Sequence, residues 1–365
     1  MFGQPLPSSN AFTPSLPMEL TFHIISFMDI SSLLATCCTN QAMSLETERY
    51  LYRDVILYNT SQITRFHDAL AKDNTRAAIV RKCTFTDFDP HHRTLVHNVL
   101  KSLFNLSSLS IVPSFDRIYD HSWDALFVGC EFKLVEFTTS FDCDHGLVDF
   151  LIKQHHIERY THSGYTPTHT AGQLGRPVVL PLLKRFHGNT VDLNIIIPSR
   201  PVTHVIVEET VAAIGLEHFI LRPLAASRGP VEYLSLSLCD PVTSDTLSLI
   251  QAYTPHLQTL ELSSPRENIQ VIAERTWGLG LAGFKWLERL TAETSLSSEG
   301  LSWAVPLCEQ KALVHLWHQS CASLRTICFQ TEKLVIGDQP VDEWTLLHGK
   351  WCYSQQRLPI FQTFW

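Results

Sequence analysis

The sequence has no uninterrupted apolar run of membrane-spanning length, and its first segment, Met1 to Pro17, is polar and rich in Pro and Ser. A membrane-spanning helix needs about 20 apolar residues, and a secretory signal peptide needs an apolar stretch of about 7–15. We therefore expect no membrane partner and no secretory route. We also expect the 10 cysteines to be reduced thiols in the cytoplasm, the nucleus or both.

Charged residues are scarce, and no run of Lys or Arg is present. They make up 18% of the chain, and the formal net charge is −8. A protein that binds a phosphate backbone needs a basic patch or stripe, so nucleic acid is not an expected partner. No arginine cluster for a phosphate group is visible either, which speaks against phosphate-dependent recognition.

Catalytic and cofactor motifs are missing as well. The chain has no P-loop, Gly-x-Ser-x-Gly elbow or kinase motif set. Gly278 to Gly283 spells Gly-x-Gly-x-x-Gly, but Asn268 to Trp277 before it has a helical pattern, whereas the dinucleotide motif follows a strand. A turn between structural units is the better interpretation of these glycines.

The densest Cys/His cluster lacks the two close ligand pairs of a zinc site. Its members are Cys143, His145, His155, His156 and His162. We therefore expect no metal, no cofactor and no catalytic residue, so the chain is not expected to be an enzyme. A dispersed active site with a cysteine nucleophile stays open as an alternative, because its His partner would be distant in sequence.

Three short helices are predicted near the N-terminus. Pro17 fits a first helical position, and Leu20, Ile24, Phe27 and Met28 then share one helix face. Asp29 or Ser31 can cap a second helix with apolar positions at Leu33, Leu34, Cys37 and Cys38. A third helix is expected over Gln41 to Tyr52, followed by the extended segment Val55 to Leu57. Three short helices cannot bury all these faces among themselves, so apolar surface should remain for a partner.

This pattern resembles the F-box family over roughly Thr13 to Leu57. The matching residues are Leu16-Pro17-x-Glu19-Leu20, Ile24-Ile25, Leu33-Leu34 with Cys37 and Cys38, and Leu51-Tyr52-Arg53. One departure is Thr39 to Met43, where many F-boxes carry a basic residue and an aromatic. The resemblance implies docking onto a Skp-type adaptor and, through it, a cullin. The contact residues that it implies are Leu16, Pro17, Leu20, Ile24, Phe27, Leu33, Leu34, Cys37, Leu51 and Tyr52.

A short phrase, usually apolar-x-x-apolar-x-apolar, recurs ten times after Tyr58. The ten phrases span 80–85, 106–111, 134–139, 157–162, 183–188, 202–207, 231–236, 257–262, 287–292 and 324–329. Most steps between them are close to the period of leucine-rich repeats, about 20–29 residues. Helical patterns lie between phrases at 62–71, 92–104, 146–154, 244–254 and 307–318. Repeated strand–helix units predict a solenoid with a parallel sheet on one face. An irregular α/β domain is the alternative.

These patterns divide the chain into four segments. They are a flexible segment (1–13), an F-box-like helical domain (14–57), a leucine-rich-repeat-like solenoid (58–335) and an aromatic-rich cap (336–365). The predicted fold is α/β, with a three-helix F-box followed by an irregular leucine-rich-repeat-like α/β solenoid. The predicted function is substrate recruitment for a Skp–cullin–F-box ubiquitin ligase, with an unknown protein substrate on the repeat domain. The alternative is a repeat scaffold that binds proteins without a ligase.

Overall fold

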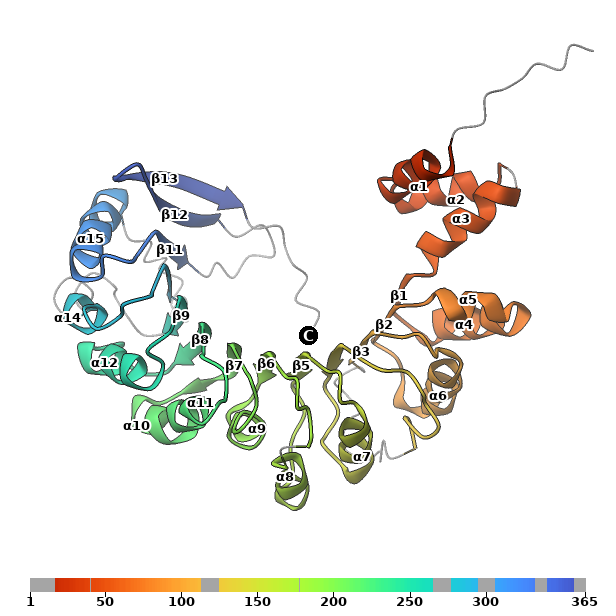
Figure 1. Ribbon diagram of the computed structural model, residues 1–365, viewed down its shortest axis with the longest axis horizontal. Helices are drawn as coiled ribbons and strands as arrows, with labels where there is room; N and C mark the ends of the chain where they lie inside the picture. Colours follow the sequence, from red (N-terminus) through yellow and green to blue (C-terminus); the bar gives the residue numbers. More distant parts are fainter. Residues whose placement is uncertain are drawn as a thin grey trace, which may run out of the picture.

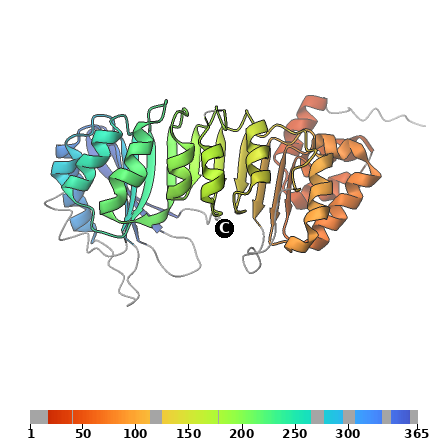
Figure 2. The same cartoon turned by 90° about the horizontal axis from the view of Figure 1, so that it is seen from below.

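The computed structural model describes residues 17–39, 41–112, 125–176, 178–264, 277–294, 306–331 and 340–357. Its centre is an open sheet of 13 strands, whose spatial order from β1 to β13 is the order of the strands in the chain. Figure 1 shows the strands along the inner side of an arc and the helices along its outer side. Seen from below, the helices lie in a row on this outer face (Figure 2). The chain is thus a mixed α/β protein.

The strands β1 to β11 run parallel to one another. Their bounds are β1 Asp54–Leu57, β2 Lys82–Thr86, β3 Ser108–Val112, β4 Glu136–Thr139, β5 Arg159–His162, β6 Arg185–Gly188, β7 His204–Val211, β8 Tyr233–Leu238, β9 Thr259–Ser264, β10 Arg289–Thr294 and β11 Thr326–Thr331. Each of the strands β2 to β11 begins at the third residue of a predicted phrase. The ten phrases are therefore confirmed as strands.

The apolar positions of each phrase face the helices, as the cleanest phrase illustrates. Leu257, Leu260 and Leu262 are at most 2% exposed, whereas Thr259 and Glu261 between them are half-buried on the opposite face. Successive side chains of a strand point to opposite faces. The buried leucines therefore form the core, and the residues between them form the inner face of the sheet.

A repeated backbone contact sets the start of each strand. The Arg53 carbonyl accepts hydrogen bonds from the amides of Arg81 (2.9 Å) and Lys82 (3.0 Å). The same double contact recurs up to the far end, where the Glu288 carbonyl accepts from Arg325 (2.8 Å) and Thr326 (2.9 Å). We call the residue directly before a strand the strand-start position. Its side chains are held at equivalent places along one edge of the sheet.

The helices fall into predicted and unpredicted groups. The five predicted between phrases are present as α4 Thr60–Lys72, α6 Arg93–Ser102, α7 His145–Lys153, α12 Ser244–Tyr253 and α15 Leu307–Ser320. The sequence did not predict η1 Pro90–His92, α5 Asn74–Ile79, α8 Thr168–Leu174, α9 Thr190–Ile196, α10 Ala213–Leu216, η3 Glu217–Leu221, α11 Arg222–Ala225 and α14 Gly278–Leu281. Five of these, η1, α5, α8, α9 and α14, are only three to seven residues long and span too few turns for a clear apolar period. The other three, α10, η3 and α11, follow one another directly as one helical stretch over 213–225.

The interpretation of Gly278 to Gly283 as a turn is wrong for its first residues, which form α14. A Cβ on Gly280 would lie 2.6 Å from the Leu247 Cβ and 2.8 Å from the Ser244 carbonyl oxygen. The glycine therefore lets α14 pack closely against α12. The predicted helical segment before it lies outside the described residues, apart from Trp277.

The three N-terminal helices lie at the predicted positions, as α1 Met18–Ser26, α2 Ile30–Cys37 and α3 Gln41–Leu51. The Asp29 side chain caps α2 by accepting a hydrogen bond from the Ser32 amide at 2.8 Å. Figure 1 shows these helices at one end of the arc, beyond β1. The sheet itself begins at Asp54, before the predicted boundary at Tyr58, because β1 pairs with β2.

The C-terminal end of the sheet is an antiparallel hairpin that the sequence did not predict. It consists of β12 Pro340–Leu347 and β13 Lys350–Arg357, with β12 paired to β11. His348 and Gly349 both have positive φ (50° and 77°), as a two-residue type I′ turn requires. Of the aromatics predicted to cap the sheet, Trp344 is buried, Trp351 half-buried and Tyr353 exposed. Phe361, Phe364 and Trp365 lie outside the described residues.

A buried arginine ties two of the short helices together. Arg200 is 0% exposed, and its guanidinium donates only to backbone carbonyls. Its partners include Leu174 (2.7 Å), Arg176 (2.8 Å), Val179 (2.8 Å), Pro198 (3.1 Å) and Ile196. Leu174 and Ile196 end α8 and α9, where helix carbonyls lack helical partners. Burial lowers the pKa of Arg200 to about 10, so it stays protonated at pH 7.

Candidate interaction surfaces

The first candidate surface is the apolar face of α1. Leu20, Ile24 and Phe27 follow one another at helical spacing and are 51%, 48% and 77% exposed. Ile25 points the other way and is fully buried. The Tyr50 hydroxyl donates to the Phe22 carbonyl at 3.3 Å and so holds α1 on α3. Ile25 therefore packs inside the molecule, whereas Leu20, Ile24 and Phe27, which directly follows α1, form an exposed apolar surface.

The second helix continues this exposure. Ile30 and Leu34, one helical turn apart, are 70% and 56% exposed, and Leu45 on α3 is 58% exposed. Three successive helices thus each expose large apolar side chains, and exposed apolar patches are typical of interaction sites. We call Leu20, Ile24, Phe27, Ile30 and Leu34 the N-terminal apolar surface.

The predicted contact residues divide into two groups. Pro17, Leu20, Ile24, Phe27 and Leu34 are exposed. Leu33 is only 7% exposed, and Cys37, Leu51 and Tyr52 are half-buried, because these side chains pack within the molecule.

Leu16 lies outside the described residues. The sequence did not single out Ile30 and Leu45 for the surface. Ile30 lies one helical turn before Leu34, and this spacing could have placed it on the same exposed face.

The N-terminal helices join the sheet through a packed hinge of charged and aromatic groups. Only Tyr52 and Arg53 separate α3 from β1. The Arg76 guanidinium on α5 lies 5.2 Å from the centre of the Tyr52 ring, and its Nη2 is 3.0 Å from Glu48 Oε1 on α3. Tyr52 also stacks on Phe66 of α4, with ring centres 6.2 Å apart. These contacts fix how α3 leaves the sheet.

The second candidate surface is the inner face of the sheet. Towards its C-terminal end the Tyr233 hydroxyl donates to Glu261 Oε2 at 2.5 Å, and the ring of Tyr233 stacks on His204 with centres 5.7 Å apart. Arg289 Nη2 lies 3.3 Å from Glu343 Oε2. An aromatic platform edged by charged groups can bind polar and apolar groups of a protein chain.

The middle of the inner face carries further ion pairs. Arg159 Nη2 lies 3.2 Å from Glu136 Oε2, and both side chains are more than one-third exposed. His187 Nε2 lies 3.1 Å from Glu208 Oε1, and Glu208 lies within the stretch between Ile206 and Thr210 where the register of β7 with β8 shifts. Burial lowers the pKa of His187 and raises that of Glu208. The exposed pair of Arg159 and Glu136 contributes little stability, so its charged groups can exchange their contact for one with another molecule.

A buried polar cluster replaces apolar residues beneath this region. At the last apolar position of their phrases, β4 and β5 carry Thr139 and His162, both 0% exposed. His162 Nδ1 contacts the buried Asp192 carboxylate, Thr166 donates to the same carboxylate, and His162 Nε2 contacts the Phe141 carbonyl at 2.8 Å. Burial lowers the pKa of His162, but its hydrogen bond to Asp192 and the charge of Asp192 raise it by more, so the net pKa is above its usual value.

This cluster bears on the alternative of a dispersed active site. Cys143 lies close enough to Asp192 for the carboxylate to add to burial in raising the pKa of the thiol. Cys143, His162 and Asp192 are each 0% exposed as whole residues. A substrate cannot reach them, and a nucleophilic thiolate needs a lowered pKa. The arrangement therefore serves packing.

No protein-family model matches the sequence, and no curated protein matches it. Among the described ranges, no helix is long and apolar enough to cross a membrane. The function therefore has to be inferred from the N-terminal apolar surface, the hinge at Tyr52 and the inner face of the sheet.

Proposed function

We propose that the chain is a substrate-recruiting adaptor of a Skp–cullin–F-box ubiquitin ligase. The observation that carries this proposal is the N-terminal apolar surface, whose side chains are 48–77% exposed. Exposed apolar side chains of this kind are stabilised when a partner removes them from water, by about 25 cal/mol per Å². A Skp-type adaptor is the partner that fits the F-box-like spacing of Leu20, Ile24 and Leu34.

The sheet supports the second half of the proposal, a leucine-rich-repeat-like solenoid that binds a protein substrate. Ten units begin their strands at the same phrase position, and each strand adds to the sheet in chain order. Such stacked units present an extended inner surface for a partner. The polar groups around Tyr233, Glu261 and Arg289 provide the means to recognise it.

The hinge at Tyr52 gives the proposal its mechanism. Arg76 bonds α5 to Glu48 of α3, so the N-terminal helices are held at a defined angle to the sheet. A substrate on the inner face is then held at a fixed place relative to the ligase. No bond is made or broken in this chain, and ubiquitin transfer is promoted by the raised local concentration of a substrate lysine.

The alternative of a scaffold without a ligase requires the N-terminal helices to dock on the sheet. Burial of Leu20, Ile24 and Leu34 against the repeats would favour it, but these three residues are 51%, 48% and 56% exposed. The exposure of the N-terminal apolar surface therefore favours the adaptor.

A binding measurement with purified proteins tests the proposal. We expect the chain to bind a Skp-type adaptor in titration calorimetry and Leu20→Asp to weaken binding at least tenfold, because a buried anchor contributes about 2 kcal/mol or more. Ile214→Asp is the matched control, since Ile214 is 96% exposed on α10. The proposal fails if adaptor binding is absent, or if the two variants bind equally well.

A further inference from the structure

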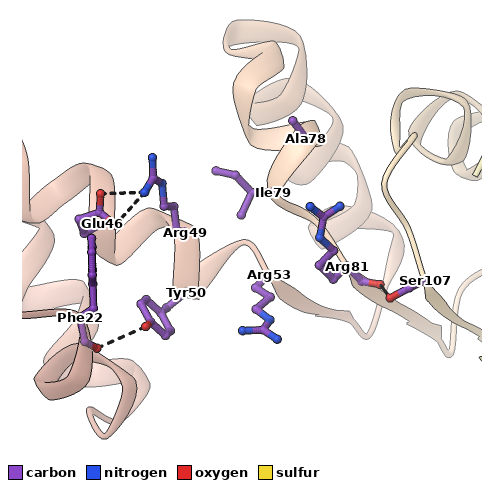
Figure 3. A pocket seen from close by; sticks show the side chains of 9 residues that line it. All are labelled: Phe22, Glu46, Arg49, Tyr50, Arg53, Ala78, Ile79, Arg81 and Ser107. Atoms are coloured by element: carbon purple, nitrogen blue, oxygen red, sulfur yellow. Dashed lines mark hydrogen bonds and ion pairs between the residues drawn. The ribbon is translucent and has the colours of Figure 1, made fainter. Parts of the chain in front are cut away.

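A groove lies between the N-terminal helices and the first strands of the sheet. It has a volume of about 630 Å³ and is lined by Phe22, Glu46, Arg49, Tyr50, Arg53, Ala78, Ile79, Arg81 and Ser107. Figure 3 shows the three arginines around it, from the end of α3 to the start of β2. We propose that this groove binds an extended acidic segment, rich in Asp or Glu, of a partner protein.

The charge of the groove is the first support. The lining contains three arginines and one carboxylate, that of Glu46, which lies 2.9 Å from Arg49. Among the residues that the structure describes, no carboxylate forms an ion pair with Arg53 or Arg81. The chain as a whole has a net charge of −8, so this local excess of positive charge runs against its overall composition and matches an anionic occupant.

The regular backbone supports an extended occupant. Arg53, Arg81 and Ser107 occupy three consecutive strand-start positions, because the carbonyls of Arg53 and Arg81 each accept the paired amides of the next strand. Neighbouring strands lie about 4.8 Å apart. A peptide crossing these starts therefore meets a guanidinium on each of two strands, while the Ser107 hydroxyl beside them already donates to the Arg81 carbonyl at 3.0 Å.

Existing bonds favour separate carboxylates over a single phosphate. Arg49 already bonds Glu46, and Arg81 Nη1 donates to the Asn105 carbonyl at 3.0 Å. The guanidiniums of Arg49 and Arg81 therefore have only part of their donors free, which suits one carboxylate per arginine. Tyr50 and Ile79 add an aromatic and an apolar wall for the stems of the acidic side chains.

The inference goes beyond ligase assembly and does not depend on it. The sequence showed no arginine cluster, because Arg53 and Arg81 are 28 residues apart and are brought together only by the pairing of β1 with β2. A ligand here would touch both α3 and the sheet. Its binding would therefore depend on how the hinge at Tyr52 holds α3 relative to the sheet.

The test uses the full chain and a fluorescein-labelled hexaglutamate peptide, followed by fluorescence anisotropy at 50 mM and 200 mM salt. We expect saturable binding that weakens with salt, and at least a tenfold loss in the double variant Arg53→Glu/Arg81→Glu. Arg325→Glu is the matched control, because Arg325 is an exposed strand-start residue at the far end of the sheet. The pair Arg53→Gln/Arg81→Gln repeats the test with a milder change, and circular dichroism checks that each variant is folded.

Three outcomes would overturn the inference. They are no saturable binding by the wild-type chain, an equal loss in Arg325→Glu, and tighter binding of a singly phosphorylated peptide of equal length than of hexaglutamate. Adaptor binding measured on the same variants separates this inference from the proposed function, because the arginines lie outside the N-terminal apolar surface. Loss of peptide binding with unchanged adaptor binding is the expected pattern.

Discussion

Replacing Asp192 by Asn tests whether the buried cluster on β5 and α9 stabilises the fold. Asp192 is 0% exposed and accepts hydrogen bonds from Thr166 and His162. Bonds to a charged group contribute about 1.5–3 kcal/mol each, against about 0.5–1.5 for neutral ones. Breaking a buried ion pair costs about 3–5 kcal/mol. We therefore expect Asp192→Asn to destabilise this part of the sheet by about 3 kcal/mol.

Hydrogen exchange at pH 6 measures this loss locally. A cost of about 3 kcal/mol corresponds to opening that is about a hundredfold more frequent, and we expect it in peptides covering β5, β6 and α9. Ser140→Ala is the matched control, because the buried Ser140 hydroxyl has no hydrogen-bond partner among the described residues. Its removal breaks no hydrogen bond given for Ser140 Oγ, so the free energy of opening should change by much less than in Asp192→Asn.

The dependence on pH gives the sign of the effect. The folded-state pKa of His162 is raised, so its protonated form favours the folded state. This contribution is fully present below the unfolded value of about 6.5 and is lost as the pH rises through the folded pKa. The difference between wild type and Asp192→Asn should therefore shrink in urea unfolding as the pH rises above 6.5. An Asn variant as stable as wild type at pH 6, or a difference that grows with pH, would refute the reasoning.

Further predictions concern the buried contacts of Arg200 and the contacts of Arg76 at the hinge. Arg200→Met should cost about 3–5 kcal/mol in urea unfolding, because several buried carbonyls lose their donor at about 1–3 kcal/mol each; a cost below 1 kcal/mol would contradict this role. Arg76→Met should speed hydrogen exchange about tenfold at the end of α3, because the bond to Glu48 and the contact with Tyr52 are lost. Unchanged exchange there would mean that Arg76 does not hold the hinge. Both variants should retain adaptor binding, since neither touches the N-terminal apolar surface.

The strands could be predicted because their signal is local. Each phrase carries its own apolar alternation, and repetition made the positions of ten strands predictable. The prediction did not extend to the hairpin of β12 and β13, because its turn, His348-Gly349, lies among aromatics that indicated a cap. The short helices α8 and α9 were missed because they span too few turns for a clear apolar period, and because Arg200, far from α8 in sequence, satisfies carbonyls at their ends.

The candidate sites show the same division between local and distant signals. The spacing of Leu20, Ile24 and Phe27 predicted an exposed face because all three lie on one helix. The partner of His162 could not be predicted, since Asp192 is 30 residues away and meets it only in the folded core. The groove around Arg53 and Arg81 also depends on strand pairing, so a search for runs of basic residues misses it.

Affinity capture with the full chain and with Leu20→Asp tests the central claim most directly. The claim is that residues near Leu20 hold the ligase and that the sheet holds the target. We predict that the wild-type chain captures a Skp-type adaptor and a cullin, that Leu20→Asp loses both, and that other partners are kept. Recovery of the adaptor and cullin with Leu20→Asp, or their absence from the wild-type capture, would contradict the account.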